Sequence, residues 1–316
     1  MAETAVGVVG LGIMGSAMSA NLVKAGFQVR GYDIVAARRA ALKRAGGKPA
    51  SSVSRLNTGI IITSLPSADA LHSVAEQLKR KCIVVETSTL PIEDKEKARD
   101  ALKRKGITLL DCPLSGTGAQ ARTGDLVVYA SGDKKAFKSV QKILQGFSRA
   151  HYYLGEFGNG SKMKFVANLL VAIHNVSAAE AFVLGMKAGL PPKLIYEVQA
   201  NGAGTSRMFQ VRGPMMVAGR YGDVTMKNEV WQKDMKIIGE FAARLGVPTP
   251  LFNASAAVYN AAMALGYARQ DTGSVCAVLE LNAGLSRARS PRRASPGARR
   301  SRLRATSAGR LPGPSR

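Results

Sequence analysis

The sequence GLGIMG, which runs from Gly10 to Gly15, joins an apolar stretch to a stretch with helical spacing. The residues before it, Ala5–Val9, are predicted to form a buried strand, and Met14–Ala25 are predicted to form a helix. A Gly-x-Gly-x-x-Gly turn in this context allows a tight turn, a close approach of backbone to phosphate and close packing of helix on strand. The context therefore predicts a dinucleotide site formed by Gly10, Leu11, Gly12, Ile13, Met14 and Gly15.

The rest of the first half continues this alternation of short apolar stretches with helical ones. Further strands are predicted at Gln28–Asp33, 59–64, Cys82–Glu86, Thr108–Asp111 and Leu126–Ala130. Nearly continuous apolar strands separated by helices are typical of a parallel sheet with helices on both faces. The predicted fold class is therefore α/β, with an N-terminal Rossmann-type doubly wound sheet that binds the cofactor over residues 1–155.

The second half of the chain shows helical spacing and no strand-like stretch. Helices are predicted at Asn159–Lys187, Pro191–Ala200, Val230–Leu245 and Leu251–Leu265, with breaks at Gly213–Pro214 and Val247–Pro250. Glycine and proline at such positions usually end helices. We therefore expect an all-α helical domain over residues 156–285.

The basic charge of the chain is concentrated at its end. The formal net charge is +24, and residues 286–316 contain ten arginines and no acidic residue. This segment has few large apolar residues, so it is predicted to be a disordered Arg-rich tail. Two origins stay open for it: a basic arm that contacts an acidic partner, or out-of-frame translation of a gene end. The rest of the chain mixes both signs of charge, which argues against nucleic acid as a partner.

Composition also argues against several other classes of protein. Hydrophobic residues make up 46% of the chain and charged residues 21%, as in ordinary globular proteins. No apolar run approaches the ~18 residues of a membrane span, and the first residues do not resemble a signal peptide. The cysteines Cys82, Cys112 and Cys276 are widely spaced. An odd, scattered set favours a cytoplasmic protein without disulfides or a metal site.

Asp33, at the end of the second predicted strand, bears on the choice of cofactor. An acidic residue there accepts hydrogen bonds from the adenosine ribose hydroxyls and repels a 2′-phosphate. No arginine follows it directly, although Arg38 and Arg39 lie on the next predicted helix. The sequence therefore predicts NAD as the cofactor, with NADP as the alternative.

Four further motifs accompany the glycine turn. They are ETSTLP at Glu86–Pro91, LDCPLSGTGAQARTGDL at Leu110–Leu126, GNGSKMKFVAN at Gly158–Asn168 and WQKDM at Trp231–Met235. In their order and spacing, the five motifs resemble the β-hydroxyacid dehydrogenase family, which includes 3-hydroxyisobutyrate dehydrogenase, tartronate semialdehyde reductase and threonate dehydrogenase. The resemblance spans about residues 4–285. It implies a homodimer or homotetramer that associates through the helix Asn159–Lys187.

Lys164 is the candidate for proton transfer. Lys164 and Asn168 are four residues apart on a predicted helix and so share one face, and partial burial of a lysine lowers its pKa. These facts alone do not distinguish Lys164 from a solvated lysine, which is how we interpret Lys162. The resemblance does so, because the family pattern G-x-G-x-x-x-K-x-x-x-N places its catalytic lysine on Lys164 and its substrate-binding asparagine on Asn168.

The resemblance also implies a substrate loop and further cofactor contacts. Ser115, Gly116 and Thr117 match the family pattern D-x-P-x-S-G-G, in which backbone amides and a hydroxyl group can bind a carboxylate. The family usually has glycine where this chain has Thr117, so the identity of the substrate stays open. The implied cofactor contacts outside the glycine turn and Asp33 are Leu65, Pro66, Thr89 and Lys233.

The residues and the resemblance together predict an NAD-dependent oxidoreductase that interconverts a small hydroxy acid and its aldehyde or keto acid. The cofactor accepts the hydride, and Lys164 is the expected general acid/base. Two alternatives remain: an imine reductase of the same fold, which usually lacks this lysine, and a non-catalytic dinucleotide-binding or nucleic-acid-binding protein. The basic tail is the feature that supports the last of these.

Overall fold

The computed structural model describes residues 5–287. Within them, the chain up to Leu285 belongs to one compact unit. The predicted disordered tail, apart from its first two residues, lies outside the described residues.

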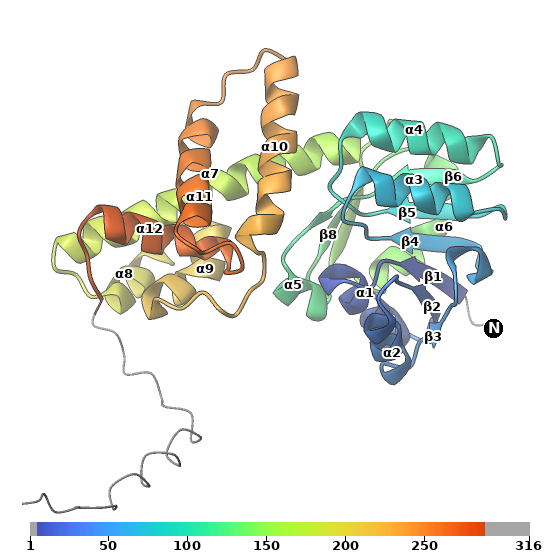
Figure 1. Ribbon diagram of the computed structural model, residues 1–316, viewed down its shortest axis with the longest axis horizontal. Coiled ribbons are helices and arrows are strands. Elements are labelled where there is room, and N and C mark those ends of the chain that lie inside the picture. The colour runs from blue at the N-terminus through green and yellow to red at the C-terminus, as the bar shows by residue number, and fades with distance from the viewer. Residues whose placement is uncertain (1–4, 288–316) are drawn as a thin grey trace, which may run out of the picture. The chain divides into compact units, whose positions relative to one another are not determined.

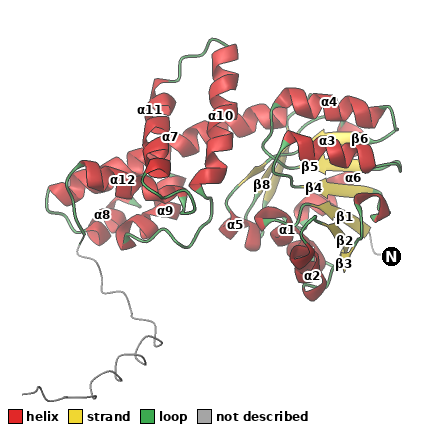
Figure 2. Ribbon diagram, in the orientation of Figure 1, coloured by secondary structure: helices red, strands yellow, loops and turns green. Residues whose placement is uncertain are grey.

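A six-stranded parallel sheet occupies the first half (Figures 1 and 2). Its strands are β1 Ala5–Val9, β2 Gln28–Tyr32, β3 Lys48–Pro49, β4 Ile60–Thr63, β5 Ile83–Glu86 and β6 Thr108–Asp111. They follow the order β3-β2-β1-β4-β5-β6. The first three strands are therefore added toward one edge of the sheet, and β4, β5 and β6 toward the other edge. Ligands of doubly wound sheets bind beyond the carboxyl ends of the strands at the point where this order reverses, which here lies between β1 and β4. The predicted fold class is confirmed.

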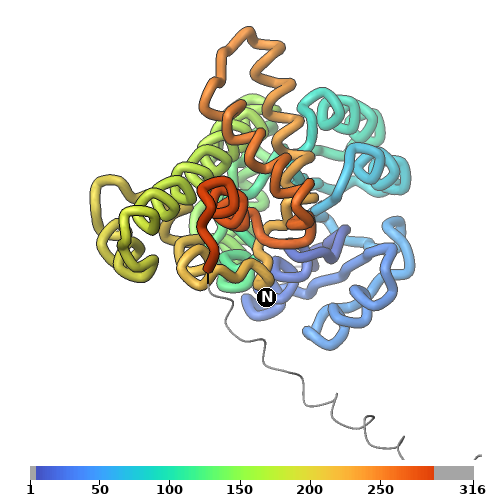
Figure 3. Tube along the Cα trace, turned by 60° about the vertical axis from the view of Figure 1, so that its left-hand side comes forward, coloured from blue at the N-terminus to red at the C-terminus, as the bar shows by residue number. Residues whose placement is uncertain are grey.

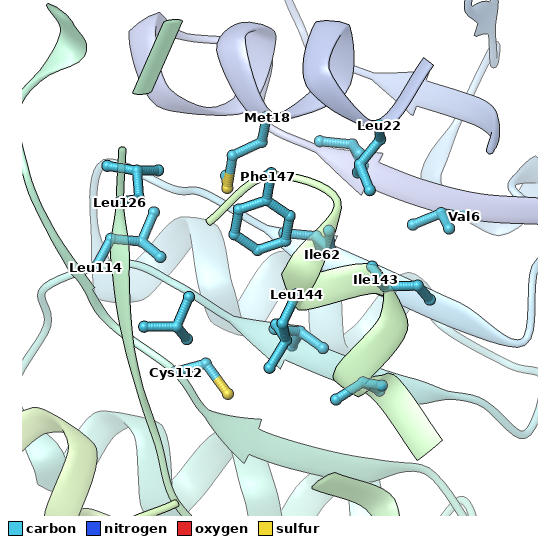
Figure 4. Packing of buried hydrophobic residues seen from close by; sticks show 14 of the residues in the cluster. Val6, Met18, Leu22, Ile62, Cys112, Leu114, Leu126, Ile143, Leu144 and Phe147 are labelled. Carbon is cyan, nitrogen blue, oxygen red and sulfur yellow. The ribbon is translucent and has the colours of Figure 1, made fainter. Parts of the chain in front are cut away.

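Helices cover both faces of this sheet. They are α1 Ile13–Lys24, α2 Ala36–Arg44, α3 Ala68–Gln77, α4 Ile92–Lys103 and α6 Lys134–Gln145, with a short 3-10 turn at Val53–Arg55. Neighbouring strand residues enter different cores: Ile62 packs with α1 and α6, whereas Ile61 packs with α3 and α4. Figure 4 shows the first core, where Met18 and Leu22 of α1 meet Phe147. Burial of both faces explains why the strands are almost continuously apolar.

A smaller sheet follows the main one. It consists of β7 Leu114–Ser115, β8 Val127–Ala130 and β9 Ala150–Tyr153, with helix α5 Gly118–Arg122 between β7 and β8. Of these strands, the sequence predicts only β8. The two residues of β7 are too few to give a pattern, and β9 has the sequence AHYY, which is only partly buried.

The second half is helical, as predicted. Its helices are α7 Asn159–Lys187, α8 Pro192–Gln199, α9 Arg207–Ala218, α10 Asn228–Arg244, α11 Pro250–Ala264 and α12 Val275–Asn282, with a 3-10 turn at Thr272–Ser274. The long helix α7 packs against α9, α10, α11 and α12 (Figure 3). By length and composition alone α7 could also cross a membrane. Its contacts are those of the central helix of a folded domain.

One predicted break was wrong. Gly213–Pro214 lies inside α9 and does not end a helix. Proline has no amide hydrogen to donate to the carbonyl four residues earlier, and that carbonyl, on Gln210, instead accepts a hydrogen bond from the Tyr196 hydroxyl at 3.1 Å. A side chain at Gly213 would meet the same tyrosine ring at 2.4 Å. Tyr196 of α8 thus supplies the hydrogen bond that Pro214 cannot make and packs against the space left by Gly213.

Candidate active site

The glycine turn has the geometry that a dinucleotide needs. Gly10 has φ +87°, and a Cβ there would lie 2.1 Å from the carbonyl oxygen of Ser64. A Cβ on Gly15 would lie 1.8 Å from the carbonyl oxygen of Gly10. At Gly12, by contrast, a Cβ would meet nothing within 4 Å, and no side chain caps the helix that Gly12 begins. The amides of the first turn of α1 thus face open space, which fits a pyrophosphate.

Asp33 is the first residue after β2. Its Oδ2 accepts hydrogen bonds from the amide of Leu11 and from Arg38, at 2.8 and 3.2 Å. Its Oδ1 accepts a hydrogen bond from the Val35 amide at 2.8 Å. Burial alone would raise the pKa of Asp33, but these amides and the guanidinium of Arg38 hold it below its ordinary value. The carboxylate is therefore charged and fixed beside the glycine turn.

The predicted substrate loop lies beside the same turn. Ser115 ends β7, Gly116 has φ +132°, and the buried Thr117 precedes α5. The side chain of Asn21 on α1 donates a hydrogen bond to the carbonyl of Ala121 on α5, at 2.7 Å. The contact between α1 and α5 is so close that a Cβ on Gly118 would lie 2.6 Å from the side chain of Ile13. The structure thus brings together two motifs about one hundred residues apart.

Lys164 and Asn168 share the buried face of α7, as predicted. Burial lowers the pKa of Lys164 to about 8; the carboxylate of Asp234 opposes this shift, and the ammonium of Lys233 adds to it. The Lys164 ammonium donates no hydrogen bond to residues 5–287, although the residue is only 9% exposed. A buried amine with a lowered pKa and free hydrogen-bonding capacity can exchange a proton with a ligand near neutral pH.

Asp234 is a site residue that the sequence analysis missed. Its Oδ2 accepts a hydrogen bond from the Asn168 amide at 3.0 Å, and its Oδ1 lies 3.2 Å from the Lys233 ammonium. The carboxylate is buried, with Asp234 only 5% exposed. The available signal was its helical position, three residues after the buried Trp231, which places both on one face of α10.

Helix α10 also reaches the main sheet. The ammonium of Lys233 donates a hydrogen bond to the carbonyl of Thr89, in the turn after β5. The neighbouring Ser88 hydroxyl accepts a hydrogen bond from the amide of Leu65 at 2.8 Å, which joins the turns after β4 and β5. The predicted cofactor contacts Leu65, Thr89 and Lys233 thus form one connected group, next to Pro66.

Three further residues are of types that could carry chemistry. Arg122 is exposed, and burial raises the pKa of the Cys112 thiol well above its ordinary value. His72 lies 3.7 Å from Asp94, between α3 and α4. Among residues 5–287, no three His, Cys, Asp or Glu side chains gather in a way that could hold a metal ion.

Comparison with known proteins shows which family has this arrangement. Residues 5–155 match the model of the NAD binding domain of 6-phosphogluconate dehydrogenase, and residues 158–279 match the model described as NAD-binding of NADP-dependent 3-hydroxyisobutyrate dehydrogenase. An L-threonate dehydrogenase of Haemophilus influenzae is 31% identical over 292 residues, which cover 89% of this chain and 96% of the relative. The chain belongs to the β-hydroxyacid dehydrogenase family.

Two further comparisons agree with that membership. A 2-(hydroxymethyl)glutarate dehydrogenase of Eubacterium barkeri is 28% identical, over 89% of this chain and 96% of its own length. The crystal structure of a 3-hydroxyisobutyrate dehydrogenase from Salmonella typhimurium superimposes with a TM-score of 0.80 at 28% identity, over 87% of this chain and all of that one. The predicted family and enzyme class are confirmed: the chain is an NAD(P)-dependent hydroxyacid dehydrogenase.

Proposed function

We propose that this dehydrogenase interconverts a small hydroxy acid and its aldehyde or keto acid, with NAD preferred and Lys164 as general acid/base. The observation that carries the proposal is the buried Lys164 beside Asn168 and Asp234, with a pKa of about 8. A proton-transfer group works best when its pKa lies near the working pH. Oxidation of the substrate needs such a group to accept the proton of its hydroxyl group.

Each remaining part of the reaction has a group suited to it. The nicotinamide cofactor, when bound, supplies the hydride acceptor for oxidation and the hydride donor for reduction. The amides around Ser115–Thr117 bind the substrate carboxylate, with the help of Asn168. Neutral Lys164 accepts the hydroxyl proton on oxidation, and protonated Lys164 returns it on reduction. The same residue favours this function over the imine reductase and non-catalytic alternatives, because neither of these needs the lysine.

The pH dependence should differ between the two directions. Oxidation needs neutral Lys164, so kcat for oxidation should rise with pH and level off above a midpoint of about 8. Reduction needs the protonated form, so its kcat should fall through the same midpoint. Steady-state rates in both directions across pH test this prediction. A flat profile in both directions, with chemistry shown to limit the rate, would remove Lys164 from proton transfer.

Asp33 should set the preference for NAD. Asp33→Ala removes the carboxylate that would bind the ribose hydroxyls and repel a 2′-phosphate, so we expect NAD affinity to fall by roughly tenfold, or about 1.4 kcal/mol. Arg38, released from its ion pair, should then improve binding of NADP. Titration of both cofactors measures the change, and Asp69→Ala, an exposed carboxylate on α3, is the control for lost charge. Unchanged affinity for both cofactors would contradict this role of Asp33.

We also propose that the chain self-associates and works in the cytoplasm. A groove between α7, α8 and α9 exposes Leu184, Leu190, Leu194 and Val198, and within the described part of the chain no Asp, Glu, Lys or Arg lines it. An apolar surface of this kind suits a second copy of the same chain. The three cysteines are free thiols, in keeping with a reducing compartment.

A further inference from the structure

A fully buried ion cluster lies under the candidate active site. The ammonium of Lys95, on α4, is 2.6 Å from Glu86 Oε2 and 2.8 Å from Asp111 Oδ1, and none of the three side chains is exposed. Burial alone would lower the pKa of Lys95, but Asp111 and Glu86 raise it above its ordinary value. Buried ion pairs are costly to form and often stabilise little. The contacts of the Lys95–Glu86–Asp111 cluster show which segments it holds in place.

One end of the cluster holds the first turn of α7. Asp111 Oδ2 accepts a hydrogen bond from the Ser161 amide at 2.7 Å, and Asp111 Oδ1 accepts one from the Ser161 hydroxyl at 2.8 Å. The preceding Gly160 amide donates to the Ser131 hydroxyl at 2.9 Å, and a Cβ on Gly160 would lie 2.3 Å from the Tyr129 carbonyl. A carboxylate is favoured at a helix N-terminus. The start of α7 is thus fixed to the strand ends, three residues before Lys164.

The other end of the cluster holds the turn after β5. Lys95 donates a hydrogen bond to the carbonyl of Ser88 at 2.7 Å, and Glu86 Oε1 accepts one from the Ser88 amide at 2.9 Å. The next residue, Thr89, is the one whose carbonyl accepts a hydrogen bond from Lys233. One ammonium therefore contacts both the turn that carries a proposed cofactor contact and the carboxylate that holds the helix of Lys164.

We propose that Lys95 is a positioning residue for the proton transfer, acting through Asp111 and Ser161 on Lys164 and through Ser88 on Thr89. It sets the place of the Lys164 amine relative to the cofactor turn, and it touches neither substrate nor cofactor. The proposal rests on the proposed role of Lys164. A cluster that only stabilised the fold would have no reason to join these two segments in particular.

Two variants and one control test the proposal. Lys95→Met removes the buried cation, and Ser161→Ala removes one hydrogen bond at the far end of the cluster. Lys105→Met is the control, because the Lys105 ammonium also braces the fold, through the carbonyls of Ala75, Glu76 and Leu78, without contacting α7 or Thr89. Thermal unfolding, NADH binding and steady-state kinetics with the best hydroxy acid substrate are measured for all three, well below each melting temperature.

We expect kcat to fall by about 10²-fold in Lys95→Met and about tenfold in Ser161→Ala, as for a catalytic group displaced by up to an ångström. The dissociation constant of NADH should rise less than kcat falls in Lys95→Met, since Thr89 is one of several proposed cofactor contacts, and should not change in Ser161→Ala. The KM should change little, and Lys105→Met should keep the wild-type kcat. Hydrogen exchange should quicken in residues 159–168 of the first two variants and stay unchanged in α11. If Lys95→Met does not fold, Ser161→Ala decides the question.

Wild-type kcat in the folded variants would overturn the proposal, as would wild-type protection of residues 159–168. Lys164→Met, assayed alongside, separates this result from a failure of the proposed function. If Lys164→Met is inactive while Ser161→Ala is normal, only the positioning role is wrong. If Lys164→Met is active, the role of Lys164 itself is wrong.

Discussion

Lys164→Met is expected to lower kcat by roughly 10²- to 10⁴-fold, the usual contribution of a general acid/base. Methionine has nearly the length of lysine and suits a buried helix face, so the variant should fold. We expect its stability to be at least that of the wild type, because the buried Lys164 ammonium donates no hydrogen bond to residues 5–287. NADH binding, which depends on the glycine turn and Asp33, should be retained. Stopped-flow and steady-state rates, with NADH fluorescence for binding, provide the measurement.

Lys162→Met is the matched control for this variant. Lys162 lies two residues earlier on the same helix and is exposed, and its ammonium donates a 3.1 Å hydrogen bond to the Asn159 side chain. Its replacement should leave kcat within about a factor of two, since exposed contacts of this kind contribute little. Equal losses in both variants would mean that α7 is disturbed generally, and near-normal rates in Lys164→Met would exclude it from catalysis.

Gly12→Ala should fold normally and yet bind NADH at least about 10²-fold more weakly. The added methyl group meets nothing within 4 Å in the protein, and the Gly12 backbone has φ −68°, which alanine adopts readily. The open space beside it is where the pyrophosphate must approach the amides of α1. Loss of two hydrogen bonds to a charged group corresponds to about 3 kcal/mol or more of binding free energy.

Gly59→Ala serves as the control for Gly12→Ala. A Cβ at Gly59 also meets nothing within 4 Å, but Gly59 precedes β4, at the opposite end of the strand from the cofactor turns. NADH affinity by fluorescence titration and melting temperature should both stay near wild type there. If Gly12→Ala bound NADH normally, the open space at the turn would not be the pyrophosphate site.

Local patterns predicted the parts of the molecule that local physics determines. The strand β1, the glycine turn and α1 follow one another in sequence, and each has a pattern tied to backbone geometry. The shared face of Lys164 and Asn168 followed from helical spacing. Long-range compensation could not be predicted in the same way. Pro214 stays helical because Tyr196, from another helix, satisfies the carbonyl it leaves free.

The same limit applies to the candidate site. Helical spacing places Asp234 on the same face as Trp231, but its contact with Asn168, 66 residues away in sequence, is seen only in the structure. In the sequence, Lys95 stands among the alternating acidic and basic residues of α4 and nothing there distinguishes it, because its burial depends on Glu86 and Asp111 from two neighbouring strands. Whether a charged residue is buried depends on partners that are distant in sequence, and a local sequence pattern does not predict them. A structure was therefore needed to find these residues.

The most direct test of the central claim is the formation of NADH by the wild-type protein and by Lys164→Met, followed by absorbance. The substrates would be 3-hydroxyisobutyrate, glycerate, threonate and 4-hydroxybutyrate, each with NAD and with NADP. We predict rapid reduction of NAD with at least one of these acids and almost none in Lys164→Met. No turnover with any acid while NADH still binds, or equal turnover in the two proteins, would contradict the account.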